Sequence, residues 1–577
     1  MNRRFLWSLG FLLFTLSASA QPADYYRYPL DLPCLLSANY AEMRPDHFHS
    51  GVDLKTGGTT GHPVHAAADG YVARISVAPS GYGRAIYIAH PNGTTTVYAH
   101  MERFTDALER YLDEERYRAQ RSNIDLFPEA SRFPVRQGDV IGLSGNSGWS
   151  LGPHVHFEVR RTKDSRTLNP IANGWIRPKD DIPPRIVKLW AVSIDTLLGV
   201  PIHGTPRAYA VQQTERGEYT LADSACVPLE GNTYFILEST DRKNDVSNTF
   251  GVWRVTARVD GETILEFEKD ALLFSNTRYC NASVHYPMQL SSRNELLMLA
   301  LQSGNHLPMY KKVVDRGVVR AAEGERKQIV IDATDDCGNL SRLSFDAIGA
   351  PHSDAPVRPQ GVVVPHDRRC SFTLREGCSV TIPAHALYES IFYTQEQLDS
   401  CHVKMRSDRI APLSPVFRIG DPKIPIHNSV AVTLFCDLPD SLQARASLAG
   451  VSAGGDLYFA GGRYKEGRVN GSIRSFGRYC VVADTKGPEI AASFRDGADL
   501  TNNRSIHFKV HDNFSGIASF SATIDGKWIA FEQDARRGVL THYFDDRRTP
   551  RGQMHRLVLT LRDGAGNKTT WEARFRR

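Results

Sequence analysis

The segment "GPHVHFEVR" (152–160) constrains the fold more than any other stretch, because its polar and apolar residues alternate. Successive side chains of a β-strand point to opposite faces of the sheet. In a strand, His154, His156 and Glu158 therefore share one face, while Val155 and the other apolar residues enter a core. We expect a rigid strand that is anchored on its apolar side and presents two imidazoles on the other.

Residues from about 25 to 180 continue this pattern of short apolar runs between turns. Further runs with strand character lie at 71–78, 85–90, 95–101 and 139–145. The turn "HPNG" (90–93) separates two of them, as in a β-hairpin. The pattern predicts an antiparallel β domain over residues 21–180.

One segment of this domain lacks strand character. Residues 102–122 contain no glycine or proline, and apolar side chains recur there at helical spacing. These side chains are Phe104, Ala107, Leu108, Tyr111 and Leu112. We predict an inserted amphipathic helix, and we prefer a packing role for it over that of a substrate lid, because apolar helix faces usually pack on a core.

After residue 180 the chain reads as all-β without histidine clusters. Two stretches resemble each other, since "DDCGN" (335–339) and "DGAGN" (563–567) both stand just before a final strand. Such a repeat fits two immunoglobulin-like sandwiches, at 181–350 and 486–577. A third strand-rich unit, which we interpret as another sandwich, is expected at 351–485. The whole chain should therefore be mainly β.

The first residues have the features of a secretory signal. Arg3 and Arg4 precede an apolar run at 5–16, and small residues at 18–20 form a cleavage site. The apolar run is shorter than the ~20 residues that a membrane-spanning helix needs. We therefore predict a signal peptide at 1–20 and an exported protein without a membrane span, periplasmic or secreted.

Charge and cysteine content exclude some classes of function. The chain of 577 residues has 69 basic and 64 acidic residues, so nothing indicates a nucleic-acid partner. None of the nine cysteines forms a CxxC pair, which argues against a structural zinc knuckle. Cys370 and Cys378 could close a short hairpin, but the odd number of cysteines leaves at least one thiol over.

The segment "HFHSGVD" (47–53) supplies a second group of metal-binding side chains. His49 and Asp53, joined by one histidine of the strand at 154–160, would complete the three-ligand set of a catalytic zinc ion with an open fourth position. The other strand histidine is then placed to take a proton from water, because the ordinary pKa of an imidazole lies close to neutral pH.

Three motifs together resemble a known family. "HSGVD", "VYAHM" and "GLSGNSGWSLGPHVHFE" follow one another in the order found in the lysostaphin/LytM-type zinc endopeptidases, which cut peptide bonds in bacterial peptidoglycan. The resemblance covers residues from about 35 to 165. It implies that His49, Asp53 and His156 bind one Zn²⁺ ion.

The same resemblance implies roles for the remaining side chains. His154 becomes the general base, and His100 the second catalytic histidine, which helps to orient water or to stabilise the oxyanion. Tyr40 is a possible equivalent of a tyrosine that stabilises the oxyanion in the family. The helix at 102–122 and the long β region after residue 180 depart from the family pattern. The substrate-binding residues are not predicted.

The resemblance therefore predicts a zinc-dependent endopeptidase that hydrolyses peptide cross-links of peptidoglycan in cell-wall remodelling. A cross-link between D-alanine and a diamino acid is the first expectation for the bond, and a glycine bridge the second. The alternative is a non-catalytic peptidoglycan-binding or regulatory protein on the same scaffold, which the complete residue set argues against. The carboxy-terminal sandwiches could position the enzyme or bind a protein partner, and a third possibility is an adhesion protein in which they carry the function.

Overall fold

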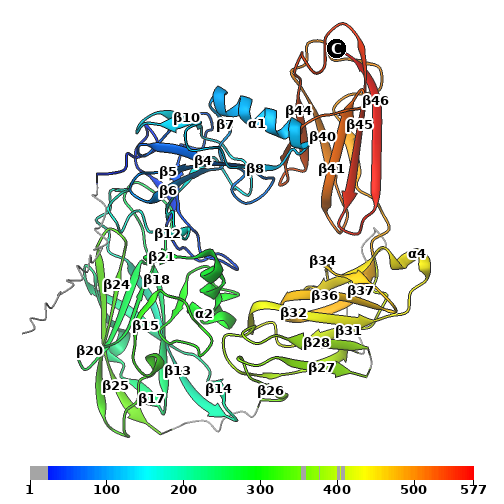
Figure 1. Ribbon diagram of the computed structural model, residues 1–577. Coiled ribbons are helices and arrows are strands. Elements are labelled where there is room, and N and C mark those ends of the chain that lie inside the picture. The colour runs from blue at the N-terminus through cyan, green and yellow to red at the C-terminus, as the bar shows by residue number, and fades with distance from the viewer. Residues whose placement is uncertain (1–23, 352–358, 376, 399–402, 405–409) are drawn as a thin grey trace, which may run out of the picture.

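The computed structural model describes residues 24–351, 359–375, 377–398, 403–404 and 410–577. The chain is mainly β, as predicted, and its strands gather into four groups that follow one another along the chain (Figure 1). The predicted signal peptide at 1–20 lies outside the described residues. None of the helices in the described part of the chain is long and apolar enough to cross a membrane.

The amino-terminal domain contains one large antiparallel sheet and one small sheet. The large sheet has the order β1-β2-β11-β6-β5-β4-β8, with β9 and β12 beside it, and the small sheet has the order β3-β10-β7. The strands are β1 Leu36–Ala38, β2 Val52–Lys55, β3 Pro63–His65, β4 Gly70–Val77, β5 Arg84–Ala89, β6 Thr94–Ala99, β7 Arg103–Phe104, β8 Ile124–Leu126, β9 Pro134–Val135, β10 Val140–Leu143, β11 His154–Arg161 and β12 Arg166–Leu168. The predicted strands and the antiparallel arrangement are thus confirmed.

Strand β11 has the two faces that its alternation predicts. Val155, Phe157 and Val159 are fully buried in the apolar core of the domain. The opposite face carries the two histidines and Glu158, which is fully buried as well. One face of this strand therefore anchors it, while the other forms a buried polar surface.

The neighbouring strands bring distant residues to that polar face. In the antiparallel pair β2–β11, Asp53 lies directly opposite His156, so their side chains share one face of the sheet. Gly51 permits this close approach: a Cβ atom there would lie 2.3 Å from the carbonyl oxygen of Phe157. On the other side of β11, strand β6 ends at Ala99, opposite His156, so His100 follows directly.

The helix predicted at 102–122 is present as α1 (Asp106–Ala119). Leu108, Leu112 and Arg116 are its buried residues, and acidic side chains stand in its first turn, where they complement the helix dipole. Arg84 reaches α1 from β5 and pairs with Glu109. The helix packs on the domain with its apolar side, in agreement with the packing role.

The second unit follows residue 180 and has a sheet of twelve strands. Its strand β21 lies outside that sheet and pairs with β12 of the first domain. Its strands are β13 Arg185–Leu197, β14 Val200–His203, β15 Arg207–Glu215, β16 Glu218–Leu221, β17 Val227–Glu230, β18 Thr233–Thr240, β19 Arg254–Val259, β20 Glu262–Glu268, β21 Ala271–Leu272, β22 Leu296–Met298, β23 Tyr310–Val313, β24 Arg326–Thr334 and β25 Leu340–Ala350, and its short helices are α2 Cys280–Ser283 and α3 Tyr286–Gln289.

The third unit has two five-stranded sheets and a two-stranded sheet, with orders β27-β28-β32-β36-β35, β30-β31-β37-β33-β34 and β26-β29. Its elements are β26 Val362–Val364, β27 Cys370–Leu374, β28 Cys378–Ile382, β29 Ile391–Tyr393, β30 Gln395–Leu398, β31 Val416–Ile419, β32 Pro425–Phe435, α4 Asp440–Gln443, β33 Ala446–Val451, β34 Leu457–Gly461, β35 Arg463–Tyr464, β36 Arg468–Ser475 and β37 Gly477–Ala483. Cys370 and Cys378 are free thiols, so they form no hairpin disulfide.

The carboxy-terminal unit has a four-stranded and a five-stranded sheet, with orders β38-β40-β44-β43 and β39-β46-β45-β41-β42. Its strands are β38 Glu489–Ala492, β39 Ala498–Asp499, β40 Ser505–His511, β41 Ile517–Ile524, β42 Lys527–Trp528, β43 Glu532–Asp534, β44 Val539–Tyr543, β45 Met554–Asp563 and β46 Lys568–Arg576. The predicted domain limits near 180, 350 and 485 stay a prediction.

The two repeated motifs make the same contacts. Asn339 donates its backbone and side-chain N–H groups to Asp335, and it also reaches the carbonyl oxygen of Asp180. Asn567 does the same with Asp563 and with the carbonyl oxygen of Asp484. In both units the asparagine therefore fastens the incoming linker to the turn before the last strand.

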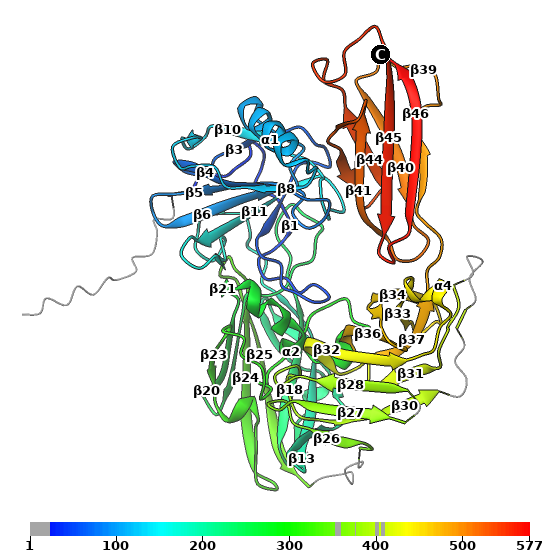
Figure 2. The ribbon, with the colours of Figure 1, turned by 45° about the vertical axis from the view of Figure 1, so that its right-hand side comes forward.

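The carboxy-terminal unit contacts the amino-terminal domain. Both views place strand β44 of the carboxy-terminal unit beside helix α1 of the first domain (Figures 1 and 2). An ion pair between Arg84 and Glu532 joins residues that are 448 positions apart. The first and last parts of the chain are therefore in direct contact.

Candidate metal centre

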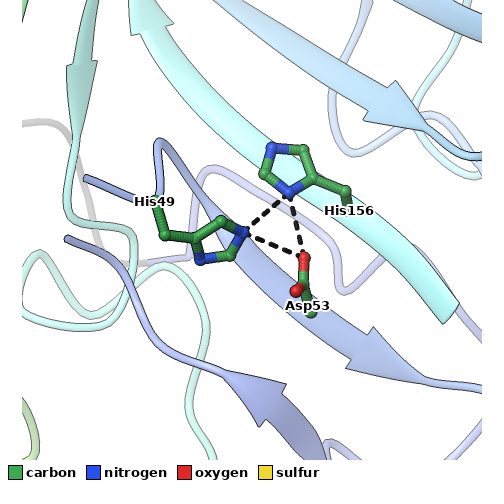
Figure 3. Close-up of side chains that lie close together, drawn as sticks. All are labelled: His49, Asp53 and His156. Atoms are coloured by element: carbon green, nitrogen blue, oxygen red, sulfur yellow. Dashed lines mark hydrogen bonds and ion pairs between the residues drawn. The ribbon is translucent and has the colours of Figure 1, made fainter. Parts of the chain in front are cut away.

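The structure brings three predicted residues to one point. Nε2 of His49 lies 3.0 Å from Nδ1 of His156, and Oδ1 of Asp53 lies 3.1 Å and 2.9 Å from these two nitrogens (Figure 3). The three side chains are almost completely shielded from solvent. One metal ion could therefore be reached by all three donor atoms, two imidazole nitrogens and a carboxylate oxygen.

Hydrogen bonds on the outer side fix the direction of both imidazoles. Nδ1 of His49 donates to the carbonyl oxygen of Asn39 at 2.7 Å, and Nε2 of His156 donates to the Glu158 carboxylate at 2.8 Å. Each ring therefore turns its other nitrogen toward the centre. Such outer partners are typical of metal-binding histidines, whose tautomer and orientation they set.

Glu158 is the centre of a buried hydrogen-bond network that the sequence motifs do not predict. Besides His156, its carboxylate accepts hydrogen bonds from Ser50, Tyr82 and Arg160. The charge of Arg160 and the bond from His156 overcome the effect of burial and hold the pKa of Glu158 below its ordinary value. A charged acceptor therefore stands behind His156. The sequence indicates this contact in one way only, because Glu158 stands two residues after His156 and so lies on the same face of the strand.

The other two predicted histidines lie beside the cluster. The His100 and His154 ring centroids are 4.7 Å apart, and Nε2 of His154 is 3.5 Å from Oδ1 of Asp53. Nδ1 of His100 donates to the carbonyl oxygen of Ser147, and Nδ1 of His154 to that of Gly152, both at 2.8 Å. Both rings thus keep Nε2 free of these outer bonds, as the rings of the cluster keep their inner nitrogens.

His100 has an unusual backbone. Its φ of +60° is in the left-handed region, which costs a residue with a side chain about 1 kcal/mol or more. The conformation follows directly on strand β6 and is held by a bond from the His100 N–H to the carbonyl oxygen of Tyr82. Strain of this kind gathers at functional sites, where the surroundings impose it.

Burial and neighbouring groups have opposite effects on the pKa values of Asp53 and His156. Burial would raise the pKa of Asp53, but the charge of His49 and hydrogen bonds from the neighbouring histidines hold it well below its ordinary value. Burial would lower the pKa of His156, but bonds to Asp53 and Glu158 raise it to about 9. Burial and the nearby His154 and His156 lower the pKa of His100 to about 3, so this ring is neutral.

Tyrosine residues near the cluster differ from the expectation. Tyr40 is buried, and its hydroxyl donates to Thr167, so its polar end is already used in the core. Tyr82 instead lies beside the cluster, with its ring centroid 5.3 Å from that of His156 and its hydroxyl on Glu158. Tyr82 follows a glycine in a loop, where the sequence shows no periodic pattern that would place it.

Two more groups of three acidic residues occur in the described part of the chain. One consists of Asp180, Asp241 and Asp335, and the other of Asp484, Asp512 and Asp563. In the first group Lys243 already supplies a cation, 3.1 Å from Asp180 and 3.8 Å from Asp241. The three groups differ in their donors, because only the one at His49 contains imidazoles.

Comparison with known proteins matches two parts of the chain. Residues 47–110 match the sequence profile of Peptidase family M23, and residues 363–484 match that of the Zu5-like domain. The first match contains His49, Asp53 and His100. The second match falls within the third unit.

Individual relatives are similar to a part of this chain. DD-carboxypeptidase/endopeptidase Mpg of Neisseria meningitidis serogroup B is 34% identical over 124 residues, which are 22% of this chain and 22% of the relative. Peptidoglycan DD-endopeptidase ShyA of Vibrio cholerae is 28% identical over 141 residues, which are 23% of this chain and 27% of the relative. The chain thus covers about a quarter of the length of these curated relatives.

Among solved structures, the catalytic domain of lysostaphin from Staphylococcus simulans is similar with 21% identity, 26% of this chain and 95% of that domain covered, and a TM-score of 0.17. The sequence match at residues 47–110 identifies a Peptidase M23 domain in the amino-terminal part of this chain.

Proposed function

We propose that the amino-terminal domain is a zinc-dependent endopeptidase that hydrolyses peptide cross-links of bacterial peptidoglycan, in cell-wall remodelling. The observation that carries the proposal is the convergence of His49, Asp53 and His156 on one point, with both imidazoles held by outer hydrogen bonds. Names of relatives with matching sequence, a DD-carboxypeptidase/endopeptidase and a peptidoglycan DD-endopeptidase, support the substrate class.

The donor set fits zinc. Two neutral imidazoles and one carboxylate are ligands that Zn²⁺ binds in catalytic sites, where a fourth position stays open. When bound there, zinc acts as a Lewis acid on a carbonyl group and lowers the pKa of water to about 7. His49, Asp53 and His156 would hold the ion, and Glu158 would keep His156 in the tautomer that binds it.

The two remaining histidines are suited to handle protons. Nε2 of His154 lies 3.5 Å from the carboxylate of Asp53, next to the cluster but with its other nitrogen bonded to Gly152. We assign to it the role of general base. His100, whose low pKa keeps it neutral and whose Nδ1–H is donated to Ser147, would accept a hydrogen bond from the attacking water through Nε2 and so help to orient it.

The finer points of the proposal extend the same argument. We propose a cross-link between D-alanine and a diamino acid as the bond that is cut, because two relatives carry the DD- designation in their names. Peptidoglycan lies outside the cytoplasm, so the proposal includes export, to the periplasm or beyond the cell. A protein partner of the carboxy-terminal units stays a prediction.

The test uses the purified protein and isolated peptidoglycan. Mass spectrometry of the released peptides, with and without a chelator, should detect new peptide ends in the zinc-loaded sample alone. His156→Ala should abolish zinc binding and cleavage, while His154→Ala should bind zinc but turn over at least about a hundredfold more slowly. His47→Ala is the matched control, because His47 is exposed and pairs with Asp46.

The outcomes separate the proposal from its alternative. Zinc binding with peptidoglycan retention but no new peptide ends would indicate the non-catalytic wall-binding protein. Cleavage that survives both His156→Ala and His154→Ala would show that another site does the chemistry, and the assignment would be wrong.

A further inference from the structure

The carboxy-terminal unit contacts the insertion of the peptidase domain. The segment 527–543, which contains strands β42 to β44, lies against helix α1 and the residues that follow it (Figures 1 and 2). The rings of Tyr117 and Trp528 meet edge to face at 5.2 Å, and the Phe531 N–H donates to Oγ of Ser122 at 2.9 Å. Apolar and polar groups of both units thus take part.

Buried charges hold this contact together. Arg84 is 5% exposed, and one of its amino groups donates to Glu532 at 2.6 Å while the other pairs with Glu109 of α1. Glu532 also lies 3.7 Å from Arg116, which is buried as well. Since a buried guanidinium needs acceptors, the carboxylate of Glu532 is part of what makes the burial of both arginines possible.

A second contact reaches the loop that carries the general base. Arg536, in the turn between β43 and β44, donates to the carbonyl oxygen of Ser150 at 2.5 Å. Ser150 Oγ lies 3.2 Å from Nδ1 of His154 and donates to the carbonyl oxygen of Gly152, which also accepts from that nitrogen. One residue therefore separates the carboxy-terminal unit from the imidazole of His154.

The other catalytic histidine is connected through the same loop. The backbone N–H of Arg84 donates to Oγ of Ser147 at 2.9 Å, and the carbonyl oxygen of Ser147 accepts from Nδ1 of His100. Arg84 is the residue that Glu532 binds. The outer hydrogen bonds of the two proposed catalytic imidazoles thus end on Ser147 and Gly152 of this loop. Ser147 also bonds to Arg84, and Gly152 to Ser150. Arg84 and Ser150 are the residues that the carboxy-terminal unit contacts.

The domain itself holds the first part of this loop, since Ser147 Oγ donates to the carbonyl oxygen of Met101 and the Trp149 N–H to that of Gly81. Three of the ten residues from 144 to 153 are glycines, which widen its conformational freedom. Trp149 and Leu151, on either side of Ser150, are 69% and 84% exposed. Packing of these large side chains therefore does not fix the part of the loop around Ser150, and the bond from Arg536 restrains that part.

We propose that the carboxy-terminal unit is a positioning element of the peptidase site, and that Arg536 is its positioning residue. By holding the carbonyl group of Ser150, Arg536 sets the loop conformation that aims the His154 imidazole at the cluster. This inference rests on the proposed endopeptidase function of that site. It gives the last unit of the chain a task in the reaction, to which it contributes no ligand or base.

The experiment compares Arg536→Ala, Arg536→Lys and Arg537→Ala in the full-length zinc-loaded protein. Arg537 is the matched control, because it is the adjacent exposed arginine and pairs with Asp534 of its own unit. Amide hydrogen exchange of residues 144–153 and hydrolysis of peptidoglycan are measured, together with the affinity for zinc. The exchange readout does not depend on catalysis.

In Arg536→Ala, exchange of residues 144–153 should become at least about tenfold faster. The kcat should fall about ten- to a hundredfold with little change in KM, because a small displacement of a base slows the chemical step. Zinc affinity should stay at the wild-type value. Arg536→Lys should recover part of both losses, and Arg537→Ala should match the wild type.

Unchanged loop exchange in Arg536→Ala would overturn the inference even if the wild type cleaves peptidoglycan. An equal loss of kcat in Arg537→Ala would overturn it too, because the effect would not be specific to the contact with Ser150. If the wild type fails to cleave while loop exchange depends on Arg536, the proposed function is wrong and the restraint of the loop is right. The two failures are therefore distinguishable.

Discussion

Each histidine of the site uses one ring nitrogen for an outer acceptor and keeps the other for the interior. The acceptors are the carbonyl oxygens of Asn39, Ser147 and Gly152, and the carboxylate of Glu158. Motifs in the sequence point to the histidines themselves, because ligand chemistry requires those residue types. Backbone acceptors leave no such trace, since any residue supplies a carbonyl group. The position of Tyr82 next to His156 could not be predicted either, because a loop without a sequence motif brings it there.

Glu158→Gln tests the role of the outer carboxylate. An amide oxygen is a weaker acceptor for the His156 N–H, and it leaves Arg160 without its charged partner. The affinity for zinc should fall about 10- to 100-fold, as for other outer partners of metal-binding histidines. Competition with a chromophoric chelator measures it. Tyr82→Phe, which leaves the bond between Glu158 and His156 in place, should change the affinity far less, and an equal fall would contradict the assignment.

The raised pKa of His156 predicts a dependence of stability on pH in the metal-free protein. In the unfolded chain this group titrates near 6.5, but in the folded protein near 9, so the folded state binds the proton more tightly. The stabilisation is complete below about pH 6.5 and is lost as the pH rises through 9, by about 3 kcal/mol.

Calorimetry of chelator-treated protein at pH 6 and pH 9.5 checks this expectation. The unfolding transition of the amino-terminal domain should move to lower temperature at the higher pH. His156→Ala should weaken that shift, because the titrating group is gone. An unfolding temperature that is the same at pH 6 and at pH 9.5 would contradict the raised pKa of His156.

At the scale of elements, the strands and α1 follow from periodicity, because alternation and helical spacing are local properties. The alternation in 154–160 predicts β11 and the face that carries the histidines, and residues 155, 157 and 159 are buried as expected. The pairing of β2 with β11 is different, since it depends on how closely two backbones approach at Gly51. That approach is visible only in the folded sheet.

Gly51→Ala should disturb this pairing. The new Cβ atom would meet the carbonyl group of Phe157 at 2.3 Å and the side chain of Glu158 at 2.7 Å, so β2 must move away from β11. We expect a loss of about 1–3 kcal/mol in the free energy of unfolding and weaker zinc binding. Thermal unfolding and zinc titration measure both. Gly152→Ala, where a Cβ atom meets open space, is the control, and equal effects there would contradict the argument.

At the scale of the whole molecule, the contact between first and last units could not be predicted from the sequence. Arg84 and Glu532 are 448 residues apart, and neither belongs to a pattern that would pair them. A lone arginine at the start of a strand is normally solvated. Burial of Arg84 by a distant unit is a property of the assembled chain. The sequence predicts only that each unit is rich in β-strands.

Glu532→Gln should loosen this contact. The substitution removes the charge that neutralises Arg84 and Arg116, and hydrogen bonds to charged groups contribute about 1.5–3 kcal/mol. Limited proteolysis should cut faster near α1 and in the segment 527–543, with no change in zinc affinity. Gln533→Ala, in the same strand, provides the comparison. Identical digestion of wild type and Glu532→Gln would show that the ion pair does not hold the units together.

The central claim is that one zinc ion is bound by residues from two distant segments of the amino-terminal domain. Anomalous diffraction at the zinc absorption edge, from crystals of the zinc-loaded protein, tests it most directly. The account predicts a single strong peak in this domain, at about 2.0–2.2 Å from His49 Nε2, Asp53 Oδ1 and His156 Nδ1. A zinc-loaded protein with no peak between these three atoms, or with zinc bound at other residues, would contradict it.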